Sequence, residues 1–228
     1  MSIPKKRQPL APGEEAAPSS PRRGHYFDPQ PQSESRPHLV KLRLGADRKL
    51  ELQADRGVFG SRRVDLGTQV LLKEAPPPPE RGEVLDLGAG YGPIAIALAR
   101  LAPGARFWAV DVNQRAVELT RVNAAAAGLG NIVAALPDEV PGEIRFAAIY
   151  SNPPVRVGKA ALHELLERWL ARLDAGGLAY LVVQRNLGAD SLMSWLGEEG
   201  YPVRRLKAKK GYRILEVGRR PEEAPPTS

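Results

Sequence analysis

Three glycines alternate with other residues directly after a short apolar run. The run is residues 84–87 (VLDL), Gly88, Gly90 and Gly92 follow it, and Pro93 starts the next segment. Glycine lets a backbone approach a ligand closely, and proline is tolerated in the first turn of a helix. This order predicts a buried strand, a glycine loop and a helix whose N-terminus offers N–H groups to a ligand. A tight turn without a ligand is the simpler alternative, but such a turn does not need three glycines.

Two further carboxylates are placed where a nucleoside ligand could meet them. Asp111 ends the second predicted strand, residues 106–111. A carboxylate at that point of a doubly wound sheet accepts hydrogen bonds from ribose hydroxyls, although it could also cap a helix near Asn113. Asp138 follows the third predicted strand and could face an adenine amine, or it could be a solvated loop acid before Pro141.

A second cluster follows the fourth predicted strand and reads Ser151, Asn152, Pro153, Pro154. The two prolines fix the backbone, so the Asn152 side chain and the neighbouring carbonyls keep a set direction. An amide oxygen and a proline-flanked carbonyl are two acceptors that can hold an exocyclic NH2 group and orient its lone pair. Such positioning needs no strong base, because orientation alone lowers a barrier substantially. The alternative is a structural turn after a strand.

The elements that must position these residues alternate between strand and helix. The predicted strands are 83–87, 106–111, 132–135, 145–150, 178–183, 203–206 and 212–217, and the predicted helices are 94–99, 113–127, 159–173 and 189–197. Repeated βαβ units predict an α/β fold with a Rossmann-like doubly wound sheet of about seven strands that ends in an antiparallel hairpin. Alternating apolar residues in 39–44 and 49–53 predict a small β-hairpin before it, continued by 57–60. Thr68 suits the N-cap of a further helix that ends before Pro76.

Composition divides the chain into four parts and excludes several classes of protein. Residues 1–37 are rich in Pro, Ser and Arg and predict a disordered tail, and 219–228 predict a second one. Between them, 38–79 hold the hairpin, helix and proline spacer, and 80–218 hold the predicted α/β domain. The 228 residues include no cysteine, three scattered histidines and no apolar run of 18, so we expect no metal site and no membrane span. We expect a cytoplasmic protein that is a monomer or a weak homo-oligomer.

The glycine spacing and the asparagine cluster together resemble a known enzyme class. The spacing is G-x-G-x-G after Asp86, whereas a dinucleotide fingerprint is G-x-G-x-x-G. The residues DLGAGYG resemble the first motif of class I methyltransferases, which bind S-adenosylmethionine, and NPP after the fourth strand resembles their N-methyltransferases. Further segments complete a resemblance to the "methyltransferase small domain" family over about residues 38–217: Gly57-Val58-Phe59, Asp65-x-Gly67-Thr68, Val110-Asp111-Val112-Asn113 and Gly158-Lys159.

The resemblance implies roles for particular residues. It implies S-adenosylmethionine as cofactor, with contacts from Asp86, the three glycines, Asp111, Val112 and Asp138. It places Thr68 near the methionine end of the cofactor, and Asp86 beside that end as a residue that orders the loop. The best-known members methylate guanine N2 in small-subunit ribosomal RNA, so the resemblance implies RNA as substrate and Asn152, Pro153 and Pro154 as the catalytic group.

Two departures from the family keep other functions open. The residue after the prolines is usually aromatic and stacks on a flipped base, but here it is Val155, so Tyr26, Phe27 or Tyr150 would have to supply the ring. The ribosomal enzymes also carry an extra amino-terminal domain, where this chain has a tail and a hairpin. One alternative is a protein glutamine N-methyltransferase, because the NPP motif serves a side-chain amide equally well. The other is a non-catalytic RNA-binding module, which Val155 alone supports.

The C-terminal hairpin is strongly basic and predicts contact with RNA phosphates. Eight Lys and Arg residues between 204 and 220 stand against Glu216, within a chain of net charge +7 and pI near 9.8. Tyr201 and Tyr212 are interleaved with them. A solvated edge hairpin is the alternative. The residues expected to bind RNA are Lys207, Lys209, Lys210 and Arg213.

Overall fold

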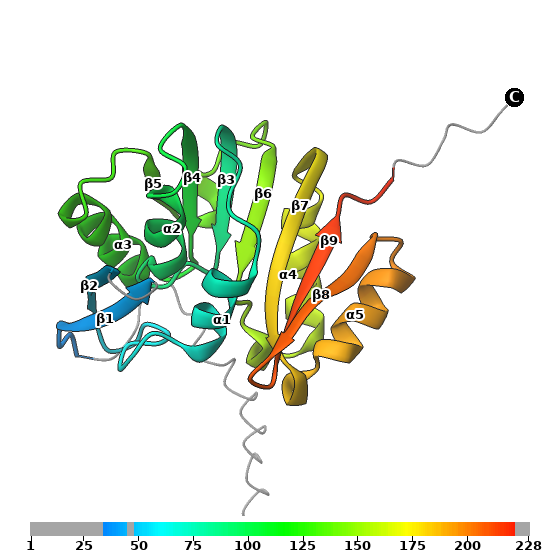
Figure 1. The fold of residues 1–228 in the computed structure, drawn as a ribbon, viewed down its shortest axis with the longest axis horizontal. Coiled ribbons are helices and arrows are strands. Elements are labelled where there is room, and N and C mark those ends of the chain that lie inside the picture. Colours follow the sequence, from blue (N-terminus) through cyan, green and yellow to red (C-terminus); the bar gives the residue numbers. More distant parts are fainter. Residues whose placement is uncertain (1–33, 45–47, 222–228) are drawn as a thin grey trace, which may run out of the picture.

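A seven-stranded sheet forms the centre of the protein in the computed structural model, which describes residues 34–44 and 48–221 (Figure 1). The strands run in the order β5-β4-β3-β6-β7-β9-β8. They are β3 (Gly82–Leu87), β4 (Ala105–Val110), β5 (Ile132–Ala135), β6 (Phe146–Ser151), β7 (Leu173–Gln184), β8 (Val203–Lys209) and β9 (Tyr212–Gly218). The five strands from β3 to β7 pair in parallel, and β9 joins β7 and β8 in antiparallel pairs. The predicted doubly wound sheet with a closing antiparallel hairpin is confirmed.

Helices cover both faces of this sheet. On one face lie α1 (Leu66–Glu74) and α2 (Pro93–Ala99), and beside them α3 (Gln114–Ala126) packs on β5, as Figure 1 shows from the front. On the other face α4 (Lys159–Leu170) and α5 (Ala189–Glu198) bury apolar side chains against the sheet. Successive side chains of a strand point to opposite faces of the sheet, so the apolar core is divided into one cluster on each face. In β3, Val84 belongs to one of these clusters and Leu85 to the other.

The predicted N-terminal hairpin is a separate two-stranded antiparallel sheet. Its strands are β1 (His38–Leu44) and β2 (Arg48–Ala54). The alternation is real, because Val40, Leu42, Leu50 and Leu52 point inward onto α2 and α3 while the intervening residues face solvent. The hairpin therefore adds an apolar layer beside the first helices.

Several element boundaries differ from the sequence prediction. The helix predicted to run to residue 173 ends at Leu170, because Leu173 already pairs with Phe146 and opens β7, which passes through the glycines at 176 and 177. Residues 57–60 form turns and do not continue the hairpin. The N-cap of α1 is Asp65 and not Thr68, since the Asp65 carboxylate accepts hydrogen bonds from the backbone N–H groups of Gly67 and Thr68.

The described residues contain neither a membrane-spanning helix nor a metal-binding cluster. No helix among them is both long and apolar enough to cross a membrane. Within the same ranges, His, Asp and Glu side chains do not gather in threes in a way that could hold a metal ion.

Candidate active site

The glycine loop connects β3 to α2 at the carboxyl edge of the sheet, where parallel α/β sheets bind ligands. Gly90 and Gly92 have φ values of +59° and +89°, a region that side chains other than glycine rarely adopt. At Gly92 a Cβ would also lie 2.9 Å from the Thr120 side chain. The loop is therefore held in one path over the sheet, and glycine is required at both positions.

The N–H groups of this loop are used inside the protein, which differs from the sequence expectation. The amides of Gly88 and Ala89 donate to the Val110 carbonyl, and the amide of Gly90 donates to Asp111 Oδ2 at 2.9 Å. At the start of α2, Pro93 has no N–H, and the amide of Ala95 donates to Asp86 Oδ2. The helix end is thus satisfied by a carboxylate, so the loop is not an anion-binding cradle.

Two buried carboxylates lie beneath the loop. Asp86 is 1% exposed, and its Oδ1 has no hydrogen-bond partner among the described residues. Burial, opposed by the Ala95 hydrogen bond and reinforced by Asp111, raises the pKa of Asp86 to about 7. Burial also raises the pKa of Asp111, against hydrogen bonds from Asn113, Gly90 and Val112. Buried carboxylates that lack a cationic partner suit a positively charged ligand.

A cavity opens over the loop and collects residues from three distant segments. Its walls come from the glycine loop and start of α2, from the turns before α1, and from the end of β6: Gly88, Ala89, Gly90, Tyr91, Pro93, Ile94, Phe59, Gly60, Asp65, Thr68 and Asn152. The predicted cofactor residues Gly88, Gly90 and Thr68 therefore lie in one cavity with the predicted catalytic Asn152. Asp86 and Asp111 lie under its floor.

The Asn152 amide is held in a fixed orientation by the start of α1. Its Nδ2 donates to Asp65 Oδ2 at 2.8 Å and to Thr68 Oγ1 at 3.2 Å. Both N–H bonds of the amide are thereby used, so the remaining group, Oδ1, is an acceptor only. The neighbouring Ser151 hydroxyl donates to the Leu87 carbonyl and ties the end of β6 to the end of β3. Pro153 is buried behind Asn152.

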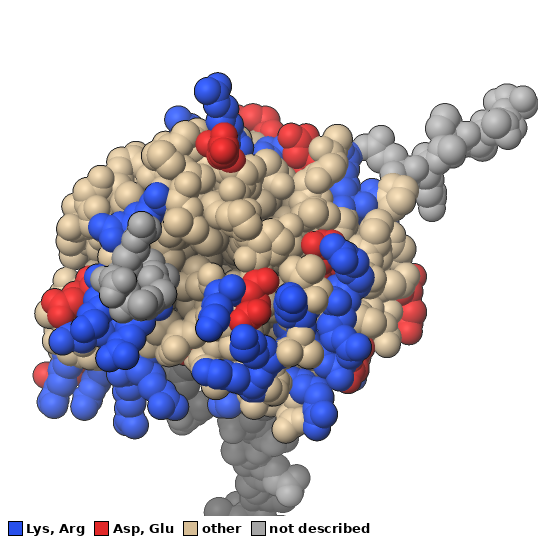
Figure 2. All heavy atoms as spheres, viewed as in Figure 1, with Lys and Arg blue, Asp and Glu red and all other residues tan. Residues whose placement is uncertain are grey.

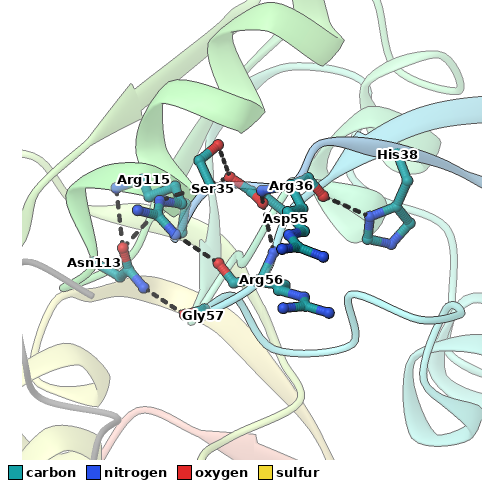
Figure 3. A network of polar contacts seen from close by, with 9 residues as sticks. Ser35, Arg36, His38, Asp55, Arg56, Gly57, Asn113 and Arg115 are labelled. Atoms are coloured by element: carbon teal, nitrogen blue, oxygen red, sulfur yellow. Dashed lines mark hydrogen bonds and ion pairs between the residues drawn. The ribbon is translucent and has the colours of Figure 1, made fainter. Parts of the chain in front are cut away.

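A polar network fastens the turns after β2 to the start of α3, close to the cavity (Figure 3). Asn113 caps α3, as predicted, and its Nδ2 donates to the Gly57 carbonyl at 2.9 Å. Arg115 reaches the Arg56 carbonyl and forms an ion pair with Asp55 at 3.7 Å. This network fixes the segment that carries Phe59 into the cavity wall.

Asp55 is the buried centre of that network. Burial raises its pKa, but hydrogen bonds from Ser35 and from the amides of Arg36 and Arg56, together with the charge of Arg115, outweigh burial and hold the pKa below its usual value. The Ser35 hydroxyl and the Arg36 amide come from residues that the sequence assigned to the tail.

Other residues predicted from sequence lie away from the cavity. Asp138 is on a short 3-10 turn, Pro137–Glu139, and its exposed side chain pairs with Arg168 at 2.8 Å. Tyr150 is buried, and its hydroxyl donates to the Pro76 carbonyl, so it cannot stack on a substrate. Val155 packs partly against the main core. Tyr26 and Phe27 lie outside the described residues.

Phe59 and Asp65 are site residues to which sequence reasoning gave no role. The Phe59 side chain is 56% exposed at the cavity wall, an unusual position for a ring. The Asp65 carboxylate accepts a hydrogen bond from the Asn152 side-chain amide, and it also caps the N-terminus of α1. Both belong to the segments that carried the family resemblance, and only the folded arrangement brings them beside residues 88–92 and 152.

The basic hairpin is less free than the sequence suggests. Arg213 pairs with Asp190, and Lys209 Nζ lies 2.6 Å from Glu74 Oε1. Tyr201 is buried, and a Cβ at Gly67 would lie 2.9 Å from the ring of Tyr212, which packs on the start of α1. Lys207 and Lys210 remain exposed.

Comparison with known proteins identifies the family to which this chain belongs. The family described as "Methyltransferase small domain" matches residues 49–216. An uncharacterised protein of Bacillus subtilis, YbxB, is 34% identical over 196 residues, which are 85% of this chain and 97% of that protein. Ribosomal RNA small subunit methyltransferase C of Pseudomonas aeruginosa is 37% identical over 181 residues, which are 76% of this chain and 52% of that protein.

A solved structure of similar fold contains bound ligands. It is the Thermus thermophilus 16S rRNA N2 G1207 methyltransferase in complex with S-adenosylmethionine and guanosine, with a TM-score of 0.67 and 27% identity over 81% of this chain and 51% of that one. This chain thus spans about half the length of the ribosomal RNA enzymes that it matches.

The site fits the cofactor that this family uses. S-adenosylmethionine carries a sulfonium and an ammonium group, and the orphan Oδ1 of Asp86 beneath the loop is the buried acceptor that such charges would satisfy. The cofactor would supply an electrophilic methyl group, and the glycine loop, the two carboxylates and Asn152 are the parts of this chain that would hold cofactor and substrate. The protein is an S-adenosylmethionine-dependent methyltransferase, and it belongs to the methyltransferase small domain family.

Proposed function

We propose that this enzyme methylates RNA, at the exocyclic N2 of guanine in small-subunit ribosomal RNA. The observation that carries the proposal is the state of the Asn152 amide, whose N–H bonds are engaged by Asp65 and Thr68. Its free oxygen can only accept a hydrogen bond, and an exocyclic NH2 group offers one. The relatives named above as ribosomal RNA methyltransferases support RNA as the substrate class.

The residues of this chain would act by positioning. Asn152 Oδ1 and the backbone carbonyl before Pro153 would each accept a hydrogen bond from the substrate NH2, so that the nitrogen lone pair faces the cofactor methyl group. No residue needs to remove the proton before methyl transfer, because the methylated nitrogen becomes acidic and loses its proton to solvent. Phe59 would provide the ring that the family usually places after the prolines, and its exposed face at the cavity wall supports base stacking there.

One experiment separates this proposal from its rivals. Purified protein is incubated with radiolabelled S-adenosylmethionine and either total RNA or total protein from a strain lacking the gene. We expect label in the small-subunit ribosomal RNA, and N2-methylguanosine after digestion to nucleosides and mass spectrometry. Label in protein only would support a glutamine methyltransferase, and a different methylated nucleoside would overturn guanine N2.

A further inference from the structure

A groove of about 1000 Å³ lies on the sheet face covered by α1 and α2, outside the cofactor cavity. Its floor is apolar and includes Leu66 and Leu101, which are 38% and 56% exposed. Its rim holds five cations, Arg43, Lys73, Arg100, Lys209 and Lys210, against one carboxylate, Glu74. Figure 2 shows Lys and Arg gathered over the lower half of this face.

Most of this charge is uncompensated. Glu74 pairs with Lys209 at 2.6 Å, and the charge of Lys209 together with its hydrogen bond holds the pKa of Glu74 below its usual value. The other four cations form no ion pair with any residue in 34–44 or 48–221. The hairpin residues outside the groove differ, because Arg204 and Arg213 pair with Glu216 and Asp190.

The groove and the catalytic cavity lie beside each other at the first turn of α1. Asp65 and Thr68 line the cavity, while Leu66 and Gln69 line the groove, so one helical turn separates the two. The turn between β8 and β9, which carries Lys209 and Lys210, is fixed at the same point because Tyr212 packs on the first turn of α1. A polyanion bound in the groove would therefore reach the mouth of the cavity.

We infer that this groove binds the sugar-phosphate backbone of single-stranded RNA next to the nucleotide that enters the cavity. The inference rests on the proposed RNA substrate. Four free cations around an apolar floor match a chain whose phosphates alternate with sugars and bases. The RNA surface is thus the α1–α2 face, with only Lys209 and Lys210 of the basic hairpin taking part.

A pair of matched double variants tests the groove. Lys73→Gln with Arg100→Gln removes two exposed rim charges, and Arg81→Gln with Arg106→Gln removes two exposed charges at the amino edge of the sheet that do not line the groove. The probe is a fluorescently labelled, mixed-sequence single-stranded RNA of twelve nucleotides, titrated at several salt concentrations. Neither variant changes a residue of the cofactor cavity, so the affinity for S-adenosylmethionine serves as a folding control.

The two variants should behave differently. We expect the groove variant to bind RNA roughly tenfold more weakly at 0.1 M salt, with the slope of log K against log salt reduced by about 1.4, and the amino-edge variant to match wild type. Three outcomes would overturn the proposal that the groove binds RNA: equal effects of both variants, no effect of either variant, or no RNA binding by the wild type. If the groove variant weakens RNA binding but wild type methylates no ribosomal RNA, the proposed function fails while the groove stands.

Discussion

At the scale of single residues, Asn152 lines the same cavity as the glycine loop, and we propose that its amide oxygen holds the substrate. Asn152→Ala removes the only free acceptor that the amide presents, while Pro153 and Pro154 still fix the backbone. We expect turnover to fall by roughly 10² or more through lost orientation, with cofactor affinity within about twofold of wild type. Single-turnover methyl transfer and calorimetry measure the two quantities. A folded variant that methylates at the wild-type rate would remove Asn152 from the mechanism.

We expect Asp65 to act as a positioning residue through its hydrogen bond with Asn152. The Asn152 amide and the backbone amides of Gly67 and Thr68 all donate to Asp65 Oδ2, and Asp65→Asn replaces this charged acceptor with a neutral, weaker one of the same shape. We expect kcat to fall about tenfold, because the Asn152 amide is then free to rotate, with KM and cofactor affinity little changed. Thr68→Ser, which keeps the hydroxyl, is the matched control. An unchanged kcat in Asp65→Asn would show that the contact serves only to cap α1.

Asp86 makes the stability of the cofactor-free protein depend on pH. Its pKa of about 7 in the folded protein lies above the ordinary value of about 3.9 expected when unfolded, so the folded state binds more protons between those values. The free energy of unfolding should therefore fall as pH rises from about 4 to about 7, by up to about 1.4 kcal/mol per pH unit.

Urea denaturation at pH 5.5 and pH 8 measures this dependence. Asp86→Asn should remove the part of the pH dependence that comes from this residue. The part that comes from Asp111, whose pKa is also raised, should remain. The same pH slope in wild type and variant would mean that Asp86 is not the group responsible. Because a cation near Asp86 stabilises its charged form, cofactor should stabilise wild type more at pH 8 than at pH 5.5.

At the scale of elements, the small β1–β2 sheet depends on one buried carboxylate. Asp55 accepts hydrogen bonds from Ser35, Arg36 and Arg56 and pairs with Arg115 of α3. Asp55→Ala leaves these donors without their acceptor, so we expect a loss of about 2–3 kcal/mol in the free energy of unfolding. Asp174→Ala, at an exposed carboxylate, should stay within about 0.5 kcal/mol of wild type. Equal losses would disprove the role of Asp55.

The sequence predicts best those elements in which apolar residues form a clear, regularly spaced pattern. The strands of the sheet follow from short apolar runs bounded by turn residues, and the meeting of Asn152 with the glycine loop follows from the parallel pairing of β6 with β3. The end of α4 was misplaced, because the apolar spacing continues to Leu173, and only its pairing with Phe146 makes that residue a strand. Local pattern cannot reveal a partner 27 residues away.

The parts of the site that sequence could not predict depend on contacts between distant segments. Asp65 and Asn152 are 87 positions apart and meet through a single hydrogen bond. The use of Asp86 as the acceptor for the amide of Ala95 depends on a side-chain rotamer, and it occupies an N–H group that the sequence predicts to face a ligand. The exposure of Phe59 depends on the turns that the Asn113 and Arg115 network fixes.

At the scale of the whole molecule, three segments meet at one edge of the sheet. The glycine loop follows β3, the asparagine follows β6, and the start of α1 comes from before the sheet and holds the asparagine. The β8–β9 turn reaches the same edge, because Tyr212 at the start of β9 pairs with Gln184 at the end of β7. The predicted cofactor and substrate residues and the turn with Lys209 and Lys210 therefore lie on one side of the sheet, and the control substitutions Arg81→Gln and Arg106→Gln lie at its amino edge.

The same arrangement predicts where the folded unit begins. Ser35 and Arg36 donate to Asp55, so they belong with the β1–β2 sheet and not with the segment before them. We expect deletion of residues 1–33 to leave the urea midpoint unchanged. Deletion of residues 1–37 should lower the free energy of unfolding by about 1–3 kcal/mol, because the buried carboxylate loses two donors. Adding Asp55→Asn to the longer deletion should recover part of that loss, because a neutral amide needs fewer hydrogen-bond donors than a buried carboxylate does. If deletion of 1–33 is as damaging as deletion of 1–37, the stabilising contacts lie earlier in the chain than Ser35.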